Sequence, residues 1–247
     1  MKKIIIIGAG AMGSAFAVPC VDNKNDVTIV GTHLENDLIE KIKSNDQIHP
    51  ALKTKLSSEV KFEKFEKLQT ILNQDLDIIV CGVSSIGIEW FVQQISKKYK
   101  KGIPIILLTK GLSILDNELT TLSDKIRTLL SKDGHSEINI SAIKGPCLAA
   151  GLANKMRTGT IIANQKVKEA QLLKGIISTN YYSTEISEDI NGVELSGAIK
   201  NIYSMLIGAS EGLSNSKAPK EIQSKFFLNT AASLIHRSIS EMVEFVS

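Results

Sequence analysis

The fold is decided by the stretch IIIIGAGAMG at residues 4–13, where an apolar run passes directly into a glycine-rich turn. The isoleucines are typical of a buried strand, and Gly8, Gly10 and Gly13 form the pattern G-x-G-x-x-G at the start of a predicted helix. A second strand-like run follows at 27–30. In this context the motif predicts a dinucleotide-binding loop. Gly8 permits the tight turn, Gly10 lets the backbone approach a pyrophosphate, and Gly13 lets helix and strand pack closely.

The rest of the chain alternates short apolar strands with helices, which is typical of a parallel sheet covered on both faces. We expect strands at 4–7, 27–30, 78–81, 103–108, 138–143, 159–163 and 181–186. We expect helices at about 11–22, 35–44, 85–99, 116–131 and 167–177, with Asp116 or Asn117 capping the fourth. From Ile190 the alternation stops, and two long helices are expected at about 189–211 and 220–246, separated by turn residues at 212–219. The predicted fold is therefore a Rossmann-like, doubly wound, mostly parallel α/β domain at 1–187, followed by an all-α domain at 188–247.

The composition indicates an ordinary globular protein and excludes several classes. The chain has 247 residues, 43% of them hydrophobic, and 29 basic against 26 acidic groups, so no strong field marks a nucleic-acid binder. After residues 4–21, which glycines interrupt, no apolar run approaches the length of a membrane span. The 3 cysteines and 4 histidines are scattered, which predicts no metal site and fits a reducing cytoplasm.

The cofactor preference is read from the end of the second strand. An NAD enzyme commonly places an acid there to hold the ribose hydroxyls, but this chain reads Gly31-Thr32-His33. Without that carboxylate nothing would repel a 2′-phosphate, and Thr32 and His33 could hydrogen-bond it. We therefore expect NADP or NAD, with NADP slightly preferred.

Small and polar residues after later strands predict a chemical site at the same edge of the sheet. They occur at 82–85, 109–111 and 144–147, and ligands of open α/β sheets bind outside the carboxyl ends of the strands. A fourth segment, GVELSGAIKN at 192–201, places Lys200 one turn after two small residues. Partial burial and a nearby Lys110 would lower the pKa of Lys200 and make it a usable general acid or base, although a structural lysine is the commoner outcome.

Taken in order, these segments resemble the NAD(P)-dependent sn-glycerol-3-phosphate dehydrogenases, most closely their archaeal branch. The resemblance rests on GAGAMG at 8–13, VSS at 83–85, TKG at 109–111, GPCLA at 145–149, GVELSGAIKN at 192–201 and SISEMVE at 238–244. It implies an oxidoreductase that interconverts sn-glycerol 3-phosphate and dihydroxyacetone phosphate, supplying a glycerophospholipid precursor.

The resemblance also assigns roles to individual residues. Lys200 would be the proton donor and acceptor, with Lys110 and Asn201 beside it. The implied cofactor contacts are Gly8, Gly10, Ala11, Met12, Gly13, Thr32, His33, Ser84, Lys110 and Ala149. The implied substrate contacts are Lys110, Gly145, Cys147 and Lys200. The substrate would be a small phosphorylated molecule, and a homodimer through the helical region is a further hypothesis.

Two departures from the family pattern leave alternatives open. Cys147 stands where many members have serine, a better hydrogen-bond donor. The family's G-x-G-D segment and its arginine-asparagine pair for the substrate phosphate find no counterpart in this sequence, so we expect a helical domain truncated relative to the family. The alternatives are an impaired NAD(P)-binding remnant and a ketopantoate or β-hydroxyacid type of reductase.

Overall fold

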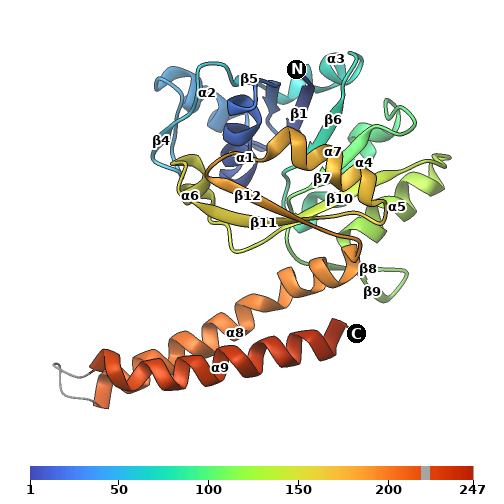
Figure 1. Ribbon diagram of the computed structural model, residues 1–247. Coiled ribbons are helices and arrows are strands. Elements are labelled where there is room, and N and C mark those ends of the chain that lie inside the picture. Colours follow the sequence, from blue (N-terminus) through green and yellow to red (C-terminus); the bar gives the residue numbers. More distant parts are fainter. Residues whose placement is uncertain (218–222, 247) are drawn as a thin grey trace.

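Figure 1 shows the protein as a computed structural model that describes residues 1–217 and 223–246. The strands are β1 (Lys3–Ile7), β2 (Asp26–Val30), β3 (Ile48–His49), β4 (Thr54–Lys55), β5 (Lys61–Glu63), β6 (Ile78–Cys81), β7 (Pro104–Leu107), β8 (Leu112–Leu115), β9 (Glu118–Thr121), β10 (Asn139–Lys144), β11 (Thr158–Ala163) and β12 (Tyr182–Ser187). The helices are α1 (Ala11–Asp22), α2 (Asn36–Ser44), α3 (Leu68–Leu72), α4 (Ile88–Ser96), α5 (Leu122–Lys132), α6 (Ala149–Ala153), α7 (Val167–Ile177), α8 (Ile190–Lys217) and α9 (Gln223–Val246). Short 3-10 turns lie at Phe65–Lys67 and Ser85–Gly87.

The main sheet has 8 strands in the order β12-β11-β10-β7-β6-β1-β2-β5. From β5 to β10 all neighbours are parallel, whereas β11 runs antiparallel to β10 and parallel to β12. The strand that leads into the glycine motif, β1, pairs with β2 on one side and β6 on the other. The predicted mostly parallel, doubly wound sheet is confirmed, and the carboxyl ends of β1, β6, β7 and β10 lie at one edge.

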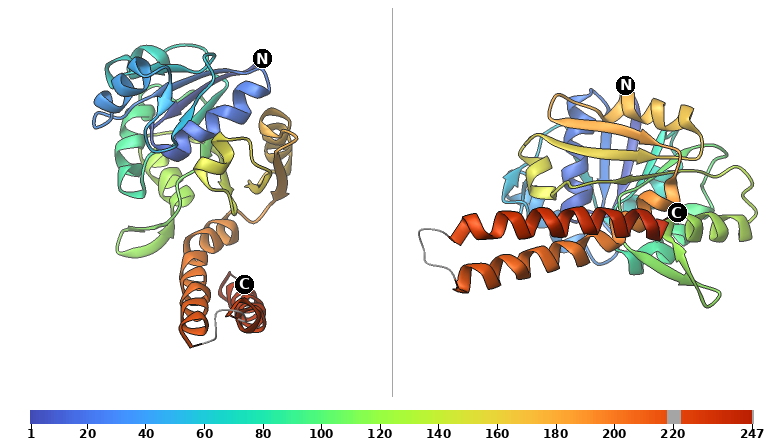
Figure 2. Two further views of the ribbon diagram at one scale, coloured as in Figure 1. Left: turned by 90° about the vertical axis from the view of Figure 1, so that its left-hand side faces the viewer. Right: turned by 60° about the horizontal axis from the view of Figure 1, so that its bottom comes forward.

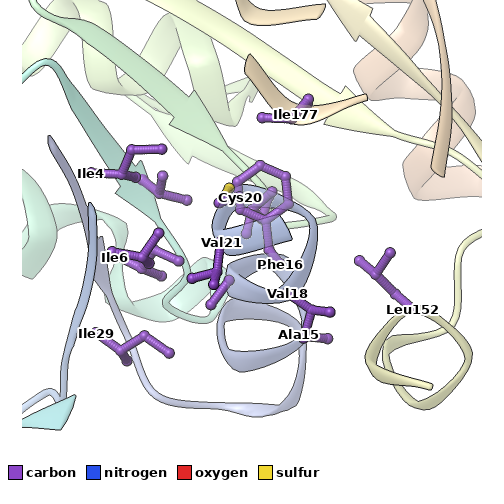
Figure 3. Close-up of a cluster of buried hydrophobic side chains, with 14 of the residues drawn as sticks. Ile4, Ile6, Ala15, Phe16, Val18, Cys20, Val21, Ile29, Leu152 and Ile177 are labelled. Carbon is purple, nitrogen blue, oxygen red and sulfur yellow. The ribbon is translucent and has the colours of Figure 1, made fainter. Parts of the chain in front are cut away.

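Both faces of the sheet are buried, which explains the uninterrupted isoleucines of β1. Successive side chains of a strand point to opposite faces. Ile4 and Ile6 pack in a cluster with α1, α6 and α7, while Ile5 and Ile7 pack in a second cluster with α3, α4 and α5. Figure 3 shows the first cluster, in which Phe16 and other residues of α1 lie against Ile4 and Ile6.

The prediction of a helix at 116–131 is wrong for residues 116–121, which are not helical. Residues 112–121 form a β8–β9 hairpin, and Asp116 and Asn117 occupy its turn with φ values of 51° and 68°. Aspartate and asparagine tolerate this left-handed conformation as well as they cap helices, so the residue types alone could not decide. Helix α5 begins at Leu122, and its cap is Thr121, whose hydroxyl accepts a hydrogen bond from the Asp124 amide at 3.3 Å.

Helices α8 and α9 lie side by side and project from the α/β domain (Figures 1 and 2). The turn expected at 212–219 is wrong for residues 212–217, which continue α8; the rest of that segment and the start of the helix expected at 220–246 lie outside the described residues. Ala231 and Ser238, spaced for one face of α9, are its buried side chains among those described.

Within residues 1–217 and 223–246, none of the helices combines the length and apolar character that crossing a bilayer requires. In the same part of the chain, no three His, Cys, Asp or Glu side chains cluster as metal ligands would.

Candidate active site

The loop between β1 and α1 contains two glycines that the fold itself requires. Gly8 has φ +112°, and a Cβ added to it would lie 2.7 Å from the backbone carbonyl carbon of Gly82 at the end of β6. A Cβ on Gly13 would lie 2.3 Å from the carbonyl oxygen of Gly8. Neither position can accept a side chain without moving the backbone, so these two glycines are explained by the packing of β1, β6 and α1.

Gly10 has no such structural reason to be glycine. Its φ of −61° and ψ of 174° suit any residue, and the nearest atom to an added Cβ is Glu35 Oε1 at 3.8 Å. Gly10 is the N-cap of α1 and makes no side-chain capping bond, so the helix N-terminus presents free backbone amides there. The open approach and the amides are what a bound pyrophosphate needs, so the loop fits a dinucleotide.

The carbonyl of Ala9 holds this loop in place. It accepts hydrogen bonds from Ser14 Oγ at 2.9 Å and from His49 Nε2 at 3.0 Å. His49 is 1% exposed, and its Nδ1 accepts from the Ala51 and Leu52 amides, so Nε2 must carry the proton. This contact could not be predicted from local sequence patterns, because His49 lies 40 positions from Ala9.

The sequence predicted that no carboxylate would lie at the end of β2, and this prediction is wrong, because Glu35 lies there. Glu35 Oε2 accepts hydrogen bonds from the Thr32 amide at 2.8 Å and the Ala9 amide at 3.0 Å. A turn brings it there, since the Glu35 amide donates to the Thr32 carbonyl at 2.9 Å. The residues 31–33 contain no acid, but the acid two positions later folds back onto the same place.

His33 is exposed and packs against two aromatic rings. Its ring centroid lies 5.4 Å from that of Trp90 and 6.1 Å from that of Phe65. These contacts keep the imidazole at the end of β2, beside Thr32. The planes of the three rings are inclined to one another by 44° to 69°, so the rings form an edge-to-face aromatic cluster near the end of β2.

The residues predicted for the chemistry converge on two neighbouring cavities. Met12 of the glycine loop, Lys110, Gly145 and Cys147 line a small one between α1 and the ends of β7 and β10. Lys200 lines the other, of about 370 Å³, together with Gly145, Ser196 and Gly197. Gly145 borders both, so the cofactor loop and the two lysines surround one region.

The positive charge of Lys200 acts on the side chain of Lys110. Burial lowers the pKa of Lys110, and the positive charge of Lys200 lowers it further. Lys200 itself is half-buried on α8. The expected proximity of the two lysines is therefore present in the structure.

Other predicted contacts lie at the margins of this region. Ala11 and Ala149 are half-buried and pack against the core at the starts of α1 and α6. Ser84 is exposed at the end of the β6 loop, where it precedes a 3-10 turn. Asn201 is exposed and is not among the residues that line either cavity.

A buried lysine and a buried glutamate behind the site were missed by sequence reasoning. Lys144 is 3% exposed, and its Nζ donates to the carbonyls of Thr109 at 2.5 Å and Leu107 at 3.3 Å. The first of these carbonyls belongs to the residue before Lys110, so Lys144 fixes the segment that carries that lysine. Gly197 of α8 packs against this side chain, since a Cβ there would be in van der Waals contact with Lys144 at 3.4 Å.

Glu194 lies beside Lys144 and is fully buried on α8. One carboxylate oxygen accepts from the Ser123 amide at 3.1 Å, and the other, Oε1, has no hydrogen-bond partner among the described residues. Burial raises the pKa of Glu194, and the charge of Lys144 opposes that rise. The hydrogen bond to Ser123 ties α8, which carries Lys200, to the start of α5.

The burial of Lys144 predicts a pH-dependent stability. Burial lowers its pKa from 10.5 to about 8, although the charge of Glu194 acts in the opposite direction. Between pH 8 and 10.5 the unfolded chain retains a proton that the folded chain has released, so the free energy of unfolding should rise with pH relative to Lys144→Met. The slope of this difference can reach about 1.4 kcal/mol per pH unit.

Urea unfolding followed by the fluorescence of Trp90 measures this difference. The matched control is Lys168→Met, which removes an exposed lysine of α7 and should give a curve parallel to the wild type. Parallel curves for Lys144→Met as well would show that Lys144 does not titrate in this range.

The fold and this site define the protein as a dinucleotide-binding α/β protein with a helical second part. A family model described as the N-terminus of NAD-dependent glycerol-3-phosphate dehydrogenase matches residues 3–170, and the corresponding C-terminus model matches 189–247. The chain belongs to the NAD-dependent glycerol-3-phosphate dehydrogenase family.

Individual relatives agree with this assignment. The NADP(+)-dependent glycerol-3-phosphate dehydrogenase of Archaeoglobus fulgidus is 33% identical over 243 residues, which cover 98% of this chain and 69% of the relative. The glycerol-3-phosphate dehydrogenase [NAD(P)+] of Mesoplasma florum is 29% identical over 245 residues, 99% of this chain and 68% of the relative. The chain thus spans about two thirds of each.

Solved structures support the fold. Glycerol-3-phosphate dehydrogenase from Coxiella burnetii superposes with a TM-score of 0.78 at 22% identity, over 99% of this chain and 68% of that one. The glycerol-3-phosphate dehydrogenase of Plasmodium falciparum superposes with a TM-score of 0.79 at 22% identity, over 99% of this chain and 65% of that one.

Proposed function

We propose that this protein is an oxidoreductase that interconverts sn-glycerol 3-phosphate and dihydroxyacetone phosphate with NAD or NADP. The observation that carries the proposal is the convergence of Met12, Lys110, Gly145 and Lys200 around two cavities that share Gly145. Family membership supplies the reaction, since the relatives are named for it.

The glycine loop is the part of the chain that would hold the cofactor. The open approach to Gly10 and the free amides at the N-terminus of α1 suit a pyrophosphate. The hydrogen bonds to the Ala9 carbonyl hold the loop in the conformation that presents these amides. Ala11 and Met12 follow in the first turn of α1, with Thr32 and His33 on the adenosine side, while Ser84 and Ala149 border the edge of the sheet. When bound, the nicotinamide ring supplies or accepts a hydride.

The protein's own contribution to the reaction is proton transfer and charge stabilisation. In the reductive direction, the ammonium group of Lys200 would donate a proton to the C2 oxygen as negative charge develops there. Lys110, held by Lys144 through the neighbouring backbone, places a second positive charge at the same region. Gly145 and Cys147 would contact the substrate. Asn201 is exposed, so it could take part only if its side chain moved toward the substrate.

Steady-state kinetics test the proposal. Purified protein is mixed with reduced cofactor and dihydroxyacetone phosphate, and we expect oxidation of the cofactor that depends on the substrate. Cofactor binding without any turnover would favour a nucleotide-binding remnant. Turnover with a β-hydroxyacid precursor or ketopantoate, but not with dihydroxyacetone phosphate, would favour the other type of reductase.

The assembly and location of the protein are part of the same proposal. We propose a cytoplasmic enzyme whose helical region forms a homodimer. Exposed apolar side chains on α8 and α9, such as Met205, Leu206 and Ile239, support the dimer, and three buried, unpaired thiols fit the cytoplasm. Light scattering should give twice the mass of one chain, and a monomer at micromolar concentration would overturn the dimer.

A further inference from the structure

Lys110 lies on a short connection whose two ends are each bound by a buried lysine. The chain leaves β7 at Leu107, passes through residues 108–111 and enters the β8–β9 hairpin at Leu112. Lys110 is the charged residue of this connection and lines the smaller of the two cavities. Gly111 has φ +125°, a conformation that favours glycine, so the backbone turns directly after Lys110. The place of the Lys110 ammonium group therefore depends on what fixes the two ends.

Lys144 of β10 holds the first end. Its Nζ donates to the carbonyls of Thr109 at 2.5 Å and Leu107 at 3.3 Å. The residue is 3% exposed, so water has little access to these bonds. A buried ammonium group is costly unless its hydrogens find acceptors, so the two bonds resist any displacement of Thr109. The nearby charge of Glu194 also favours the ammonium form.

Lys125 of α5 holds the second end. Its Nζ donates to Ser113 Oγ at 3.0 Å and to the Ile114 carbonyl at 3.4 Å, and it forms an ion pair with Glu89 Oε1 of α4 at 2.6 Å. The residue is 6% exposed. Ser113 and Ile114 belong to β8, which begins two residues after Lys110. Helices α4 and α5 thus anchor the hairpin through one buried ammonium group.

The surroundings of Lys110 do not favour its charge. Burial lowers the pKa of Lys110, and the like charge of Lys200 lowers it further. An ammonium group on a flexible side chain would relieve both effects by turning toward water. Its backbone must therefore be held if the two positive charges are to stay together at the site.

We propose that Lys144 and Lys125 are positioning residues that hold Lys110 beside Lys200 in the candidate active site. Each acts through the backbone on one side of Lys110, and neither has to touch the substrate. The effect on turnover rests on the proposed function. The position of Lys110 itself can be measured without a substrate.

A double-mutant cycle on turnover is the first test. Lys144→Met and Lys125→Met keep an unbranched side chain and remove the ammonium group. Each should lower kcat/KM for dihydroxyacetone phosphate by about 10- to 100-fold, since a misplacement of about 1 Å has an effect of this size. In a Lys110→Ala background each should change kcat/KM by less than about twofold, because the residue that they position is absent. Equal losses in both backgrounds would overturn the proposal.

Asn164→Ala is the matched control for the loss of a buried polar contact. Asn164 is 3% exposed, and its side-chain amide donates to Ser141 Oγ at 2.7 Å and Asn139 Oδ1 at 2.9 Å. These residues lie at the start of β10, whereas Lys144 lies at its end. The control should lower the melting temperature but keep kcat/KM within about twofold of the wild type, since distant sites act independently. A loss of kcat/KM equal to that of Lys144→Met would mean that destabilisation alone explains the effect.

The titration of Lys110 is the second test and needs no turnover. Lysine labelled with carbon-13 at Cε is followed by NMR, and the Lys110 signal is the one that Lys110→Arg removes. The charged or titratable groups that face Lys110 are Lys200 of α8, Lys144 of β10 and the Cys147 thiol. Lys144→Met removes one of these charges itself, so Lys125→Met is the variant that decides.

In Lys125→Met the released Lys110 should move toward water and away from Lys200. Its pKa should therefore rise toward the ordinary value of 10.5. An unchanged pKa of Lys110 in this variant would overturn the proposal. Thermal melting checks that the variant is folded, and if Lys144→Met does not fold, the cycle and the titration are both decided by Lys125→Met.

The two tests separate this inference from the proposed function. If the wild type does not turn over dihydroxyacetone phosphate, the proposed function fails, and the titration of Lys110 in Lys125→Met still decides whether its position is held. If the wild type is active but the cycle gives equal losses in both backgrounds, the positioning role fails and the proposed function stands.

Discussion

Gly10→Val is expected to abolish binding of both NAD and NADP while leaving the protein folded. An added Cβ at this position meets no protein atom closer than 3.8 Å, and φ of −61° suits valine. The side chain would occupy the space through which a pyrophosphate reaches the amides of α1. We expect a loss of affinity of at least about a hundredfold, since a misplaced pyrophosphate forfeits several charge-assisted hydrogen bonds.

The control for this prediction is Gly13→Ala. Its Cβ would lie 2.3 Å from the Gly8 carbonyl oxygen, so this change should lower the melting temperature, which Gly10→Val should not do. Calorimetric titration with the dinucleotides measures the binding, and circular dichroism measures the melting. Normal cofactor affinity in Gly10→Val would show that the loop does not approach the cofactor as proposed.

Lys200→Ala is expected to reduce turnover by about 10²- to 10⁴-fold, the range typical of a lost general acid. Cofactor affinity should change little, because Lys200 lines one cavity whereas Met12 of the glycine loop lines the other. Lys200→Arg should be nearly as impaired, since a guanidinium group keeps the charge but does not release its proton. The measurement is the catalytic constant together with the dissociation constant of the cofactor.

Lys168→Ala is the matched control for Lys200→Ala, because it truncates an exposed lysine of α7 and should leave turnover unchanged. Equal losses of turnover and of cofactor affinity in Lys200→Ala would mean that the lysine supports the structure and not the chemical step.

The fold was largely predictable because its signals are local. The isoleucine run and the glycine spacing each occupy one short stretch, and each strand or helix of the alternation has its own short pattern; the structure confirms them. The hairpin at Asp116 and Asn117 was not predicted, because those residues suit a turn and a helix cap equally well.

The missed parts of the site depend on contacts between distant segments. Glu35 reaches Ala9 across 26 positions, His49 reaches the same residue across 40, and Lys144 reaches Thr109 across 35. The spacing of these residues does not indicate the contacts, because the contacts form only when the sheet brings the strand ends together. The sequence therefore predicted residues that line the two cavities better than it predicted the residues that hold the surrounding segments in place.

The central claim is that this protein transfers a hydride between a nicotinamide cofactor and carbon 2 of a three-carbon phosphate. The most direct test supplies dihydroxyacetone phosphate and reduced cofactor carrying deuterium at both hydrogens of nicotinamide C4, with mass spectrometry of the product. The account predicts sn-glycerol 3-phosphate with one deuterium at C2. An absence of that product, or a product without deuterium at C2, would contradict the account.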